Sequence, residues 1–403
     1  MTILTLDHED SSSNMKDSHY KTSKKQTNKS SMPGFGKALN RIVQGREETP
    51  EERENAINKK ARIANHDEIV NDDEMQGVTT TDYTGMRKIL VIRGFVVYSF
   101  NPENGAWERC SDARRDRSYF ETVLLNGFVY AIGSMNVTDA GTVEKFVIAE
   151  NKWENILSLP AKIRSLAAAV ITVEDGTSCI CVCGGIDLDS MTSCADVYVS
   201  CPGSEDVSED IGMWKLQTTK MLTPRYRHAS VVFDGSMWVV GGIVRGDDGE
   251  EYTSTTELMD CKTGLWTAGP AMCARRAIDV APIVVGGTLY IVGGNVGKEV
   301  VPRGQAEKVV GTIEKYDSIT NTFVVISTFP QQRKGFSSAA IPGDDNIYCF
   351  GGREDDRDLT SWDAFNTTSQ CWRSSLNTET SVGDMKMPFM DSLYGRAISM
   401  VET

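Results

Sequence analysis

A short apolar run that ends in two small residues occurs five times in this chain, at intervals of 50 to 60 residues. The five runs are VYAIGS (129–134), ICVCGG (180–185), MWVVGG (237–242), LYIVGG (289–294) and IYCFGG (347–352). A unit that recurs at this spacing is typical of small sheets arranged around an axis, because one unit alone cannot bury its apolar face. The repeats predict a ring of similar sheets rather than one continuous core.

Each run is followed by a polar loop, a second apolar strand, a tight turn and a closing aromatic residue. The closing residues are Trp107, Trp153, Trp214, Trp266, Phe323 and Trp372. A second large residue stands seven positions before the closing one except in the third unit, where an insert separates Tyr198 from Trp214. Strand, tight turn and strand make a hairpin, and a further strand precedes each small-residue pair. Each unit is thus predicted to be one four-stranded antiparallel blade of a propeller.

The two ends of the repeat region complement each other. The first unit begins at residue 87 and lacks an innermost strand, whereas residues 394–401 (YGRAISMV) read like residues 225–232 (RYRHASVV). We expect the C-terminal strand 394–401 to close the first blade, because a closed ring leaves no unpaired inner edge. The predicted fold is an all-β, six-bladed β-propeller over residues 87–403.

Residues 1–86 have a different composition, with no Trp, no Cys and only three aromatic residues. Such a segment buries too little apolar surface to offset its conformational entropy, so we expect a disordered polar tail. Thr49, Pro50 and Glu52 form a helix-start pattern that allows one short helix near 50–64. The lysine-rich stretches leave two interpretations open, a solvated tail and a nuclear-import signal.

The bulk properties narrow the class of protein. The formal net charge of −14 argues against nucleic acid and anionic membranes as partners. No apolar run approaches the roughly 18–20 residues of a membrane span, and the first residues do not resemble a signal peptide. We therefore expect a cytoplasmic protein, with a nuclear location left open. Its ten cysteines are expected to be reduced thiols, and Cys179, Cys181 and Cys183 to pack as small apolar residues.

The paired small residues, the Met259-Asp260 and Tyr316-Asp317 steps and the closing tryptophans resemble the kelch-repeat family. The resemblance covers residues 87–403 and departs at Ser134 and at Arg93-Gly94. It implies a kelch-type β-propeller, here without a BTB or F-box domain. Trp-Asp repeats fit less well, since only Trp362-Asp363 shows that dipeptide.

We letter the four strands of a blade a to d, from the innermost outward. The start of each strand a carries a cation, on the face shared by the linkers between blades and the loops between strands b and c. The six cations are Arg117, Arg164, Arg227, Arg276, Lys334 and Arg396. Acidic residues follow in the b–c loops: Asp187, Asp189, Asp247, Asp248, Glu250, Glu251, Glu354, Asp355, Asp356 and Asp358. Because guanidinium groups pair with carboxylates in a bidentate manner, the sequence predicts a cationic ring that binds an acidic peptide. Tyr119, Tyr226 and Phe336 are candidate anchors. The alternative is that the cations bond loop carbonyls and hold the blades together.

Kelch adaptors of ubiquitin ligases are similar in that arginines on this face hold acidic peptides. We therefore expect a non-catalytic protein-interaction module without cofactor or metal. Two alternatives remain from the resemblance, a metal-free kelch-type sugar mutarotase and a substrate-recognition subunit of a ubiquitin ligase. Residues 87–403 contain one histidine, His228, so the histidine pair of kelch-type copper oxidases cannot form.

Overall fold

The computed structural model describes residues 87–202, 211–246, 249–277, 282–296, 308–309, 311–354, 357–375, 387 and 396–401. The tail expected for residues 1–86, with its helix near 50–64, lies outside the described residues. The described chain is all-β, as predicted, and its one helical element is a 3₁₀ turn, η1 (Ile148–Glu150).

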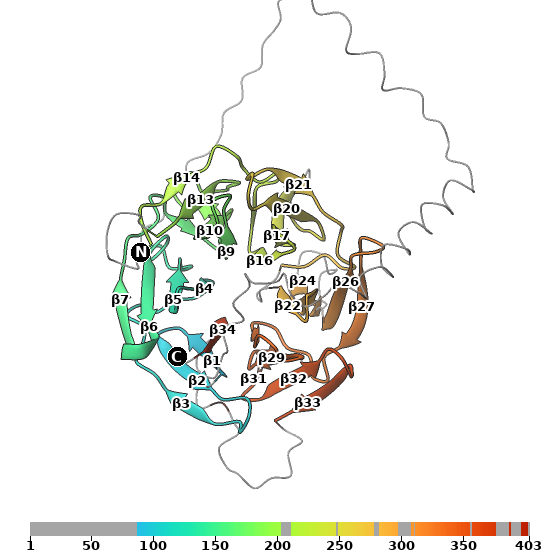
Figure 1. Ribbon diagram of the computed structural model, residues 1–403. Helices are drawn as coiled ribbons and strands as arrows, with labels where there is room; N and C mark the ends of the chain where they lie inside the picture. The colour runs from blue at the N-terminus through green and yellow to red at the C-terminus, as the bar shows by residue number, and fades with distance from the viewer. Residues whose placement is uncertain are drawn as a thin grey trace, which may run out of the picture. The chain divides into compact units, whose positions relative to one another are not determined.

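Six four-stranded antiparallel sheets stand around a common axis (Figure 1). We number them as blades in chain order and give their strands from the innermost outward. The first blade consists of β34 (Arg396–Val401), β1 (Arg87–Arg93), β2 (Val96–Phe100) and β3 (Trp107–Arg109). The second consists of β4 (Glu121–Leu125), β5 (Phe128–Ile132), β6 (Val143–Val147) and β7 (Lys152–Asn155). The third consists of β9 (Ala167–Thr172), β10 (Ser178–Cys183), β13 (Val197–Ser200) and β14 (Lys215–Leu216).

The remaining three blades repeat this order. The fourth consists of β16 (Ala229–Phe233), β17 (Ser236–Val240), β20 (Thr256–Asp260) and β21 (Trp266–Ala268). The fifth consists of β22 (Ile283–Val285), β23 (Thr288–Val292), β26 (Thr312–Asp317) and β27 (Thr322–Thr328). The sixth consists of β28 (Ser337–Ala340), β29 (Asn346–Phe350), β32 (Trp362–Asn366) and β33 (Cys371–Ser374).

Small hairpins extend the b–c loops of four blades. In the third blade β11 (Ile186–Asp187) pairs with β12 (Thr192–Ser193) and β8 (Ile163–Arg164). In the fourth, β18 (Ile243–Gly246) pairs with β19 (Gly249–Tyr252) and β15 (Arg225–Tyr226). Two-stranded hairpins form from β24 (Asn295–Val296) with β25 (Lys308–Val309), and from β30 (Arg353–Glu354) with β31 (Arg357–Asp358).

The innermost strands form a closed circuit. β34 contacts β4, β4 contacts β9, β9 contacts β16, β16 contacts β22, β22 contacts β28, and β28 contacts β34 again. The last strand, β34, is antiparallel to β1, with Leu90 opposite Ile398. The two ends of the repeat region thus share one sheet.

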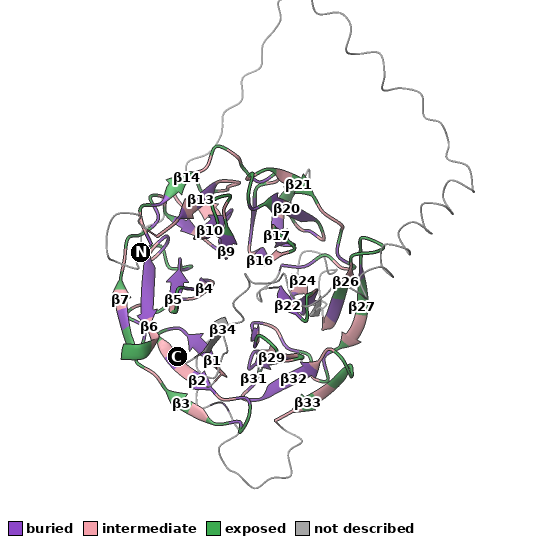
Figure 2. Ribbon diagram, viewed as in Figure 1, coloured by how far each residue is buried: buried purple, intermediate pink, exposed green. Residues whose placement is uncertain are grey.

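Apolar side chains between neighbouring blades hold the ring together. The middle strands are buried on both faces, which explains their nearly continuous apolar sequence, and the outer strands are exposed (Figure 2). Trp238 of the fourth blade, for example, packs with Tyr316 and Phe323 of the fifth. Burial of one such side chain is worth roughly 1.5–3 kcal/mol.

The small-residue pairs are required because the linker of the next blade passes over them. A Cβ atom at Gly184 would lie 2.8 Å from the carbonyl oxygen of Arg225, and φ there is +61°. In the first blade Arg93 replaces the first small residue. Its side chain is 3% exposed and reaches the sixth blade, where Nη2 donates to the carbonyl of Phe350 at 3.3 Å. Burial lowers the pKa of Arg93 to about 10.

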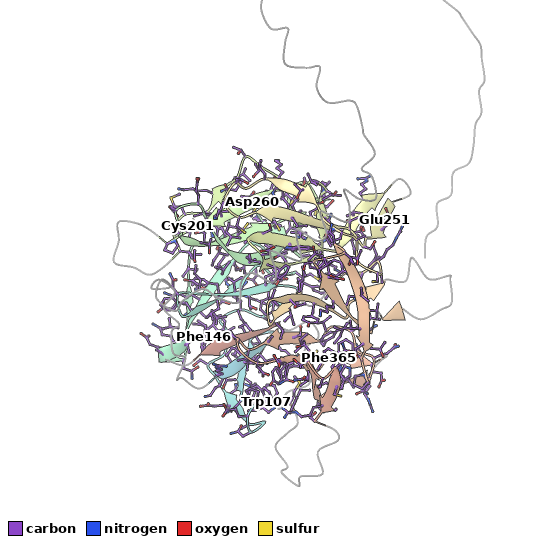
Figure 3. The ribbon with its side chains drawn as sticks, turned by 45° about the vertical axis from the view of Figure 1, so that its right-hand side comes forward. Trp107, Phe146, Cys201, Glu251, Asp260 and Phe365 are labelled. Atoms are coloured by element: carbon purple, nitrogen blue, oxygen red, sulfur yellow. A yellow bond between two sulfur atoms is a disulfide. The ribbon has the colours of Figure 1, made fainter. Side chains whose placement is uncertain are left out.

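One expectation about the cysteines is wrong. Cys179 forms a disulfide with Cys201, which is labelled in Figure 3. The reason is strand register: Ile180 pairs with Ser200, so Cys179 and Cys201 stand opposite each other on β10 and the end of β13. Cys181 and Cys183 are buried free thiols, as expected.

Candidate functional site

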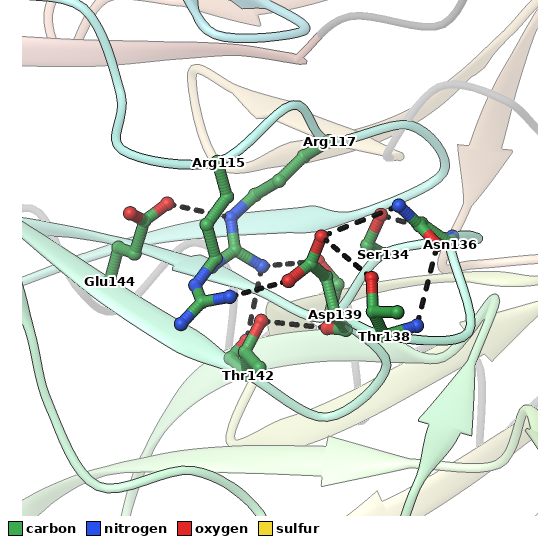
Figure 4. Close-up of polar contacts among 9 residues, drawn as sticks. Arg115, Arg117, Ser134, Asn136, Thr138, Asp139, Thr142 and Glu144 are labelled. Carbon is green, nitrogen blue, oxygen red and sulfur yellow. Dashed lines mark hydrogen bonds and ion pairs between the residues drawn. The ribbon is translucent and has the colours of Figure 1, made fainter.

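Two of the six predicted surface cations lie inside their blades. Arg117 is 1% exposed. Its Nε donates to Glu144 Oε2 at 2.9 Å, and its Nη1 donates to the carbonyl oxygens of Gly133 at 2.6 Å and Thr142 at 3.2 Å (Figure 4). Arg276 is fully buried and bonds Glu314 and the carbonyl of Gly293 in the same way. Burial lowers the pKa of both arginines, while the paired carboxylates act in the opposite direction.

The same ion pair occurs in the fourth and sixth blades, but with a cation that the sequence analysis did not choose. Arg225, rather than Arg227, pairs with Glu257 at 2.5 Å and donates to the carbonyl of Gly241 at 3.0 Å. Arg333, rather than Lys334, pairs with Asp363 and donates to the carbonyl of Gly351 at 2.9 Å.

The sequence analysis did not identify the four acidic partners, which are Glu144, Glu257, Glu314 and Asp363. A shared position marks them in the sequence. In each blade the acid stands nine positions before the closing aromatic residue, as Glu257 does before Trp266. A buried acidic side chain needs a counter-charge. The recurring acid therefore indicates that the arginine paired with it is buried and stabilises the blade.

The third blade replaces the ion pair with apolar contacts. By strand register, Ile163 occupies the position of Arg225, and Tyr198 that of Glu257. Both side chains are buried in one apolar cluster. Tyr198 pairs across the sheet with Leu216, so it is not the counterpart of Trp214 that the sequence spacing suggested.

The other predicted residues are spread over different environments. Arg164 is half-buried in β8, opposite Ile186. The backbone of Lys334 bridges to Arg353, and its N–H donates to the Arg353 carbonyl at 3.0 Å. Arg396 lies in β34, but its side chain is outside the described part of the structure. Phe336 is 1% exposed and packs against Phe329 at 5.1 Å, so it belongs to the core and is not a surface anchor. The six cations therefore do not form one exposed ring.

Three residues at the start of successive innermost strands form a compact cluster, which we call the inner-strand cluster: Tyr119, Ser165 and Arg227. The guanidinium of Arg227 lies 4.7 Å from the ring centre of Tyr119, and the backbone N–H of Arg227 donates to the carbonyl of Ser165 at 3.0 Å. All three have left-handed backbones, with φ of 50°, 54° and 52°. The sixth blade has Gly335 at this position. Left-handed non-glycine residues cost about 1–2 kcal/mol each and tend to persist at functional sites.

A hollow of about 430 Å³ lies beside this cluster, between the b–c hairpins of the third and fourth blades. We call it the hairpin groove. Its wall includes Met191, Thr192, Pro224, Tyr226, Arg245 and Glu250. Tyr226 is the one predicted anchor that lines it.

Polar contacts shape the hairpin groove and its rim. The hydroxyl of Tyr226 donates to Glu250 Oε2 at 2.8 Å. Burial and this carboxylate raise the pKa of Tyr226, so the phenol remains a neutral donor. Glu251, labelled in Figure 3, pairs with Arg275 at 3.1 Å. Met191 exposes 65% of its surface beside these polar groups.

Of the acidic residues predicted for the rim, Asp187, Glu250, Glu251, Glu354 and Asp358 lie in strands of the b–c hairpins. The hydroxyl of Ser190 donates to Asp187 at 2.8 Å, and this bond lowers the pKa of Asp187. Asp247, Asp248, Asp355 and Asp356 lie outside the described residues.

Nothing in the described part of the chain forms a group of three or more His, Cys, Asp or Glu side chains that could hold a metal ion. His228 is buried, and burial lowers its pKa to about 3, with the charge of Arg225 adding to the effect. No described helix has the length and apolar character needed to span a membrane.

Comparison with known proteins agrees with this architecture. The kelch motif matches residues 224–272 and 278–330, which contain the fourth and fifth blades. Kelch-like protein 15 of Danio rerio is 26% identical over 212 residues, 48% of this chain and 34% of the relative. Kelch-like protein 23 of Homo sapiens is 24% identical over 246 residues, 61% of this chain and 39% of the relative. Kelch-like protein terF of Aspergillus terreus is 30% identical over 159 residues, 37% of this chain and 33% of the relative. The chain spans between a third and two fifths of the length of these curated relatives. The chain thus carries kelch motifs in its fourth and fifth blades and is similar to kelch-like proteins over part of its length.

Proposed function

We propose that this protein is a non-catalytic interaction module that binds a polar segment of a partner protein in the hairpin groove. The observation that carries the proposal is the groove itself, a hollow with an exposed methionine and a fixed Tyr226–Glu250 pair on one wall. Apolar side chains that fill such pockets supply most of the affinity of a protein interface, and polar groups at the rim set its register.

The inner-strand cluster supports this location. Its strained backbones face the same side as the groove, since all belong to the linker ends that precede innermost strands. Tyr119, Ser165 and Arg227 keep a left-handed backbone in three successive blades, whereas the sixth blade has Gly335 at this position. The retained backbone strain favours a role of these residues in binding a partner over a purely structural role.

The partner chemistry differs from the initial expectation. The preference for an acidic peptide depended on six cations. Two of them, Arg117 and Arg276, already form ion pairs with Glu144 and Glu314 inside the blades. The groove itself offers both Arg245 and Glu250. We therefore propose a polar partner segment with an apolar side chain that enters beside Met191, rather than a strongly acidic one.

A matched pair of substitutions tests the proposal. Met191→Lys places a charge in the groove, and Leu265→Lys places one at a similarly exposed residue in the turn between β20 and β21, with exposures of 65% and 60%. Quantitative affinity purification with the full chain should lose a defined set of partners with Met191→Lys and retain it with Leu265→Lys. Equal loss or equal retention would overturn the location.

A charge reversal separates the two partner chemistries. With an acidic segment, Arg245→Glu should abolish binding by like-charge repulsion. With the polar segment that we propose, Arg245→Glu should weaken binding by less than Met191→Lys does.

A further inference from the structure

A second hollow, of about 360 Å³, lies on the opposite face of the ring, where the first and sixth blades meet. We call it the seam pocket. The first blade contributes Arg87 and the turn after β2, including Glu103. The sixth blade contributes the turn after β28 together with Tyr348 and Arg373.

Strand register explains why a hollow forms there. Tyr348, Ala364 and Arg373 are paired side by side across β29, β32 and β33, so their side chains share the face that meets the first blade. The small Ala364 between two large residues leaves space. At the corresponding place in the fifth blade, Lys315 stands between Tyr290 and Val324.

Two guanidinium groups line the seam pocket without a carboxylate partner among the described residues. Arg87 Nη1 donates to the carbonyl of Pro342 at 2.8 Å, and the Arg373 guanidinium lies 5.1 Å from the ring centre of Trp362. Elsewhere in the blades, arginines commonly form ion pairs with Asp or Glu, as Arg115 does with Asp139 at 2.5 Å. Two arginines without a described carboxylate partner thus line the same hollow.

Neither acidic residue of the pocket, Asp344 or Glu103, forms a described ion pair with these arginines. The carboxylate of Asp344 accepts hydrogen bonds from the Tyr348 hydroxyl at 2.7 Å and from the backbone N–H of Asn346 at 3.1 Å. Glu103 is exposed at the rim, in the turn between β2 and β3. The pocket therefore presents free donors of two arginines beside the apolar surfaces of Ile341 and Pro102.

We propose that the seam pocket binds a small molecule through a carboxylate or phosphate group held between Arg87 and Arg373. Guanidinium groups offer paired donors that match both oxyanions, and the apolar wall accommodates the carbon part of the ligand. Because Arg87 belongs to the first blade and Arg373 to the sixth, the ligand bridges the seam at which the ring closes. Binding therefore raises the stability of the closed ring by mass action.

The test uses the full chain with sodium phosphate and sodium succinate as probes, at an ionic strength held constant with sodium chloride. The melting temperature should rise in a saturable way with phosphate, succinate or both. Phosphate alone indicates a phosphoryl ligand, and succinate alone a carboxylate ligand. An equal rise with chloride alone would overturn the proposal, since screening of charge explains it.

Single substitutions locate the response. Arg87→Gln and Arg373→Gln should each reduce affinity for the effective probe about tenfold or more, measured by calorimetry. Glu103→Gln should increase affinity, because it removes a negative charge from the rim. Arg114→Gln, at an exposed arginine that lines neither hollow, is the matched control and should leave the affinity unchanged. The rise in melting temperature on ligand addition is compared within each variant, so a lower starting stability does not affect the result. Unchanged affinity in both pocket arginine variants, or loss of binding with Arg114→Gln, would refute the site.

Discussion

The buried Arg225–Glu257 pair of the fourth blade gives the sharpest prediction, because the third blade shows what can replace it. Arg225 and Glu257 are 0% and 3% exposed in their side chains. Arg225→Ile removes the ion pair and the hydrogen bonds to the carbonyls of Gly241 and Thr255, and it leaves a buried carboxylate without a counter-charge. Loss of one partner of a buried pair lowers the free energy of unfolding by about 3–5 kcal/mol.

The double variant Arg225→Ile with Glu257→Tyr copies Ile163 and Tyr198 of the third blade. It removes both charges, so the remaining loss comes from unpaired backbone groups, at about 0.5–1.5 kcal/mol per hydrogen bond. Among them is the N–H of Leu222, which now donates to Glu257 at 2.8 Å. We expect the second substitution to restore about 2 kcal/mol of the loss.

Urea unfolding followed by tryptophan fluorescence measures both effects. Arg275→Gln is the matched control, because its ion pair with Glu251 is 59% and 50% exposed and such surface pairs contribute about 0–1 kcal/mol. Glu257→Tyr alone completes the set of variants. If the losses of Arg225→Ile and Glu257→Tyr simply add in the double variant, the two charges are not coupled and the reasoning fails.

Two further predictions concern groups inside the third and fourth blades. The pKa of His228 is about 3 in the folded chain against an ordinary 6.5, so only the unfolded chain takes up a proton between these values; stability is full above pH 6.5 and falls by about 1.4 kcal/mol per pH unit toward pH 3. His228→Gln should flatten the dependence of unfolding free energy on pH in that window, and an unchanged slope would contradict the burial of a neutral imidazole. Opening the Cys179–Cys201 disulfide, which closes a loop with a sequence separation of 22, should lower stability by about 3 kcal/mol. Cys201→Ser should abolish the effect of a reductant on the urea midpoint, whereas Cys371→Ser, at an exposed free thiol, should retain it.

The repeat period and the apolar runs were enough to predict the antiparallel sheets. A strand that is buried on both faces has a nearly continuous run of apolar residues, which is visible in the sequence. The sequence analysis did not predict correctly which cations are buried. RYRHAS contains two arginines two residues apart, and only the acid at Glu257 shows that Arg225 is the buried one.

The hairpin groove could not be predicted, since it depends on how two hairpins from different blades stand beside each other. Met191 and Tyr226 are 35 positions apart and share no pattern. The disulfide depended on register: a shift of β13 by one residue would move Cys201 away from Cys179. Such relations follow from tertiary packing and leave no local periodicity.

The sharing of the first blade between β1 and β34 has a consequence for synthesis on the ribosome. β1 is synthesised before β34, so its inner edge stays unpaired until β34 has been translated. During that interval the nascent chain presents an unpaired apolar edge, which is the state most prone to aggregate. The unpaired inner edge of β1 is therefore a feature of the unfinished polypeptide and is absent from the closed ring.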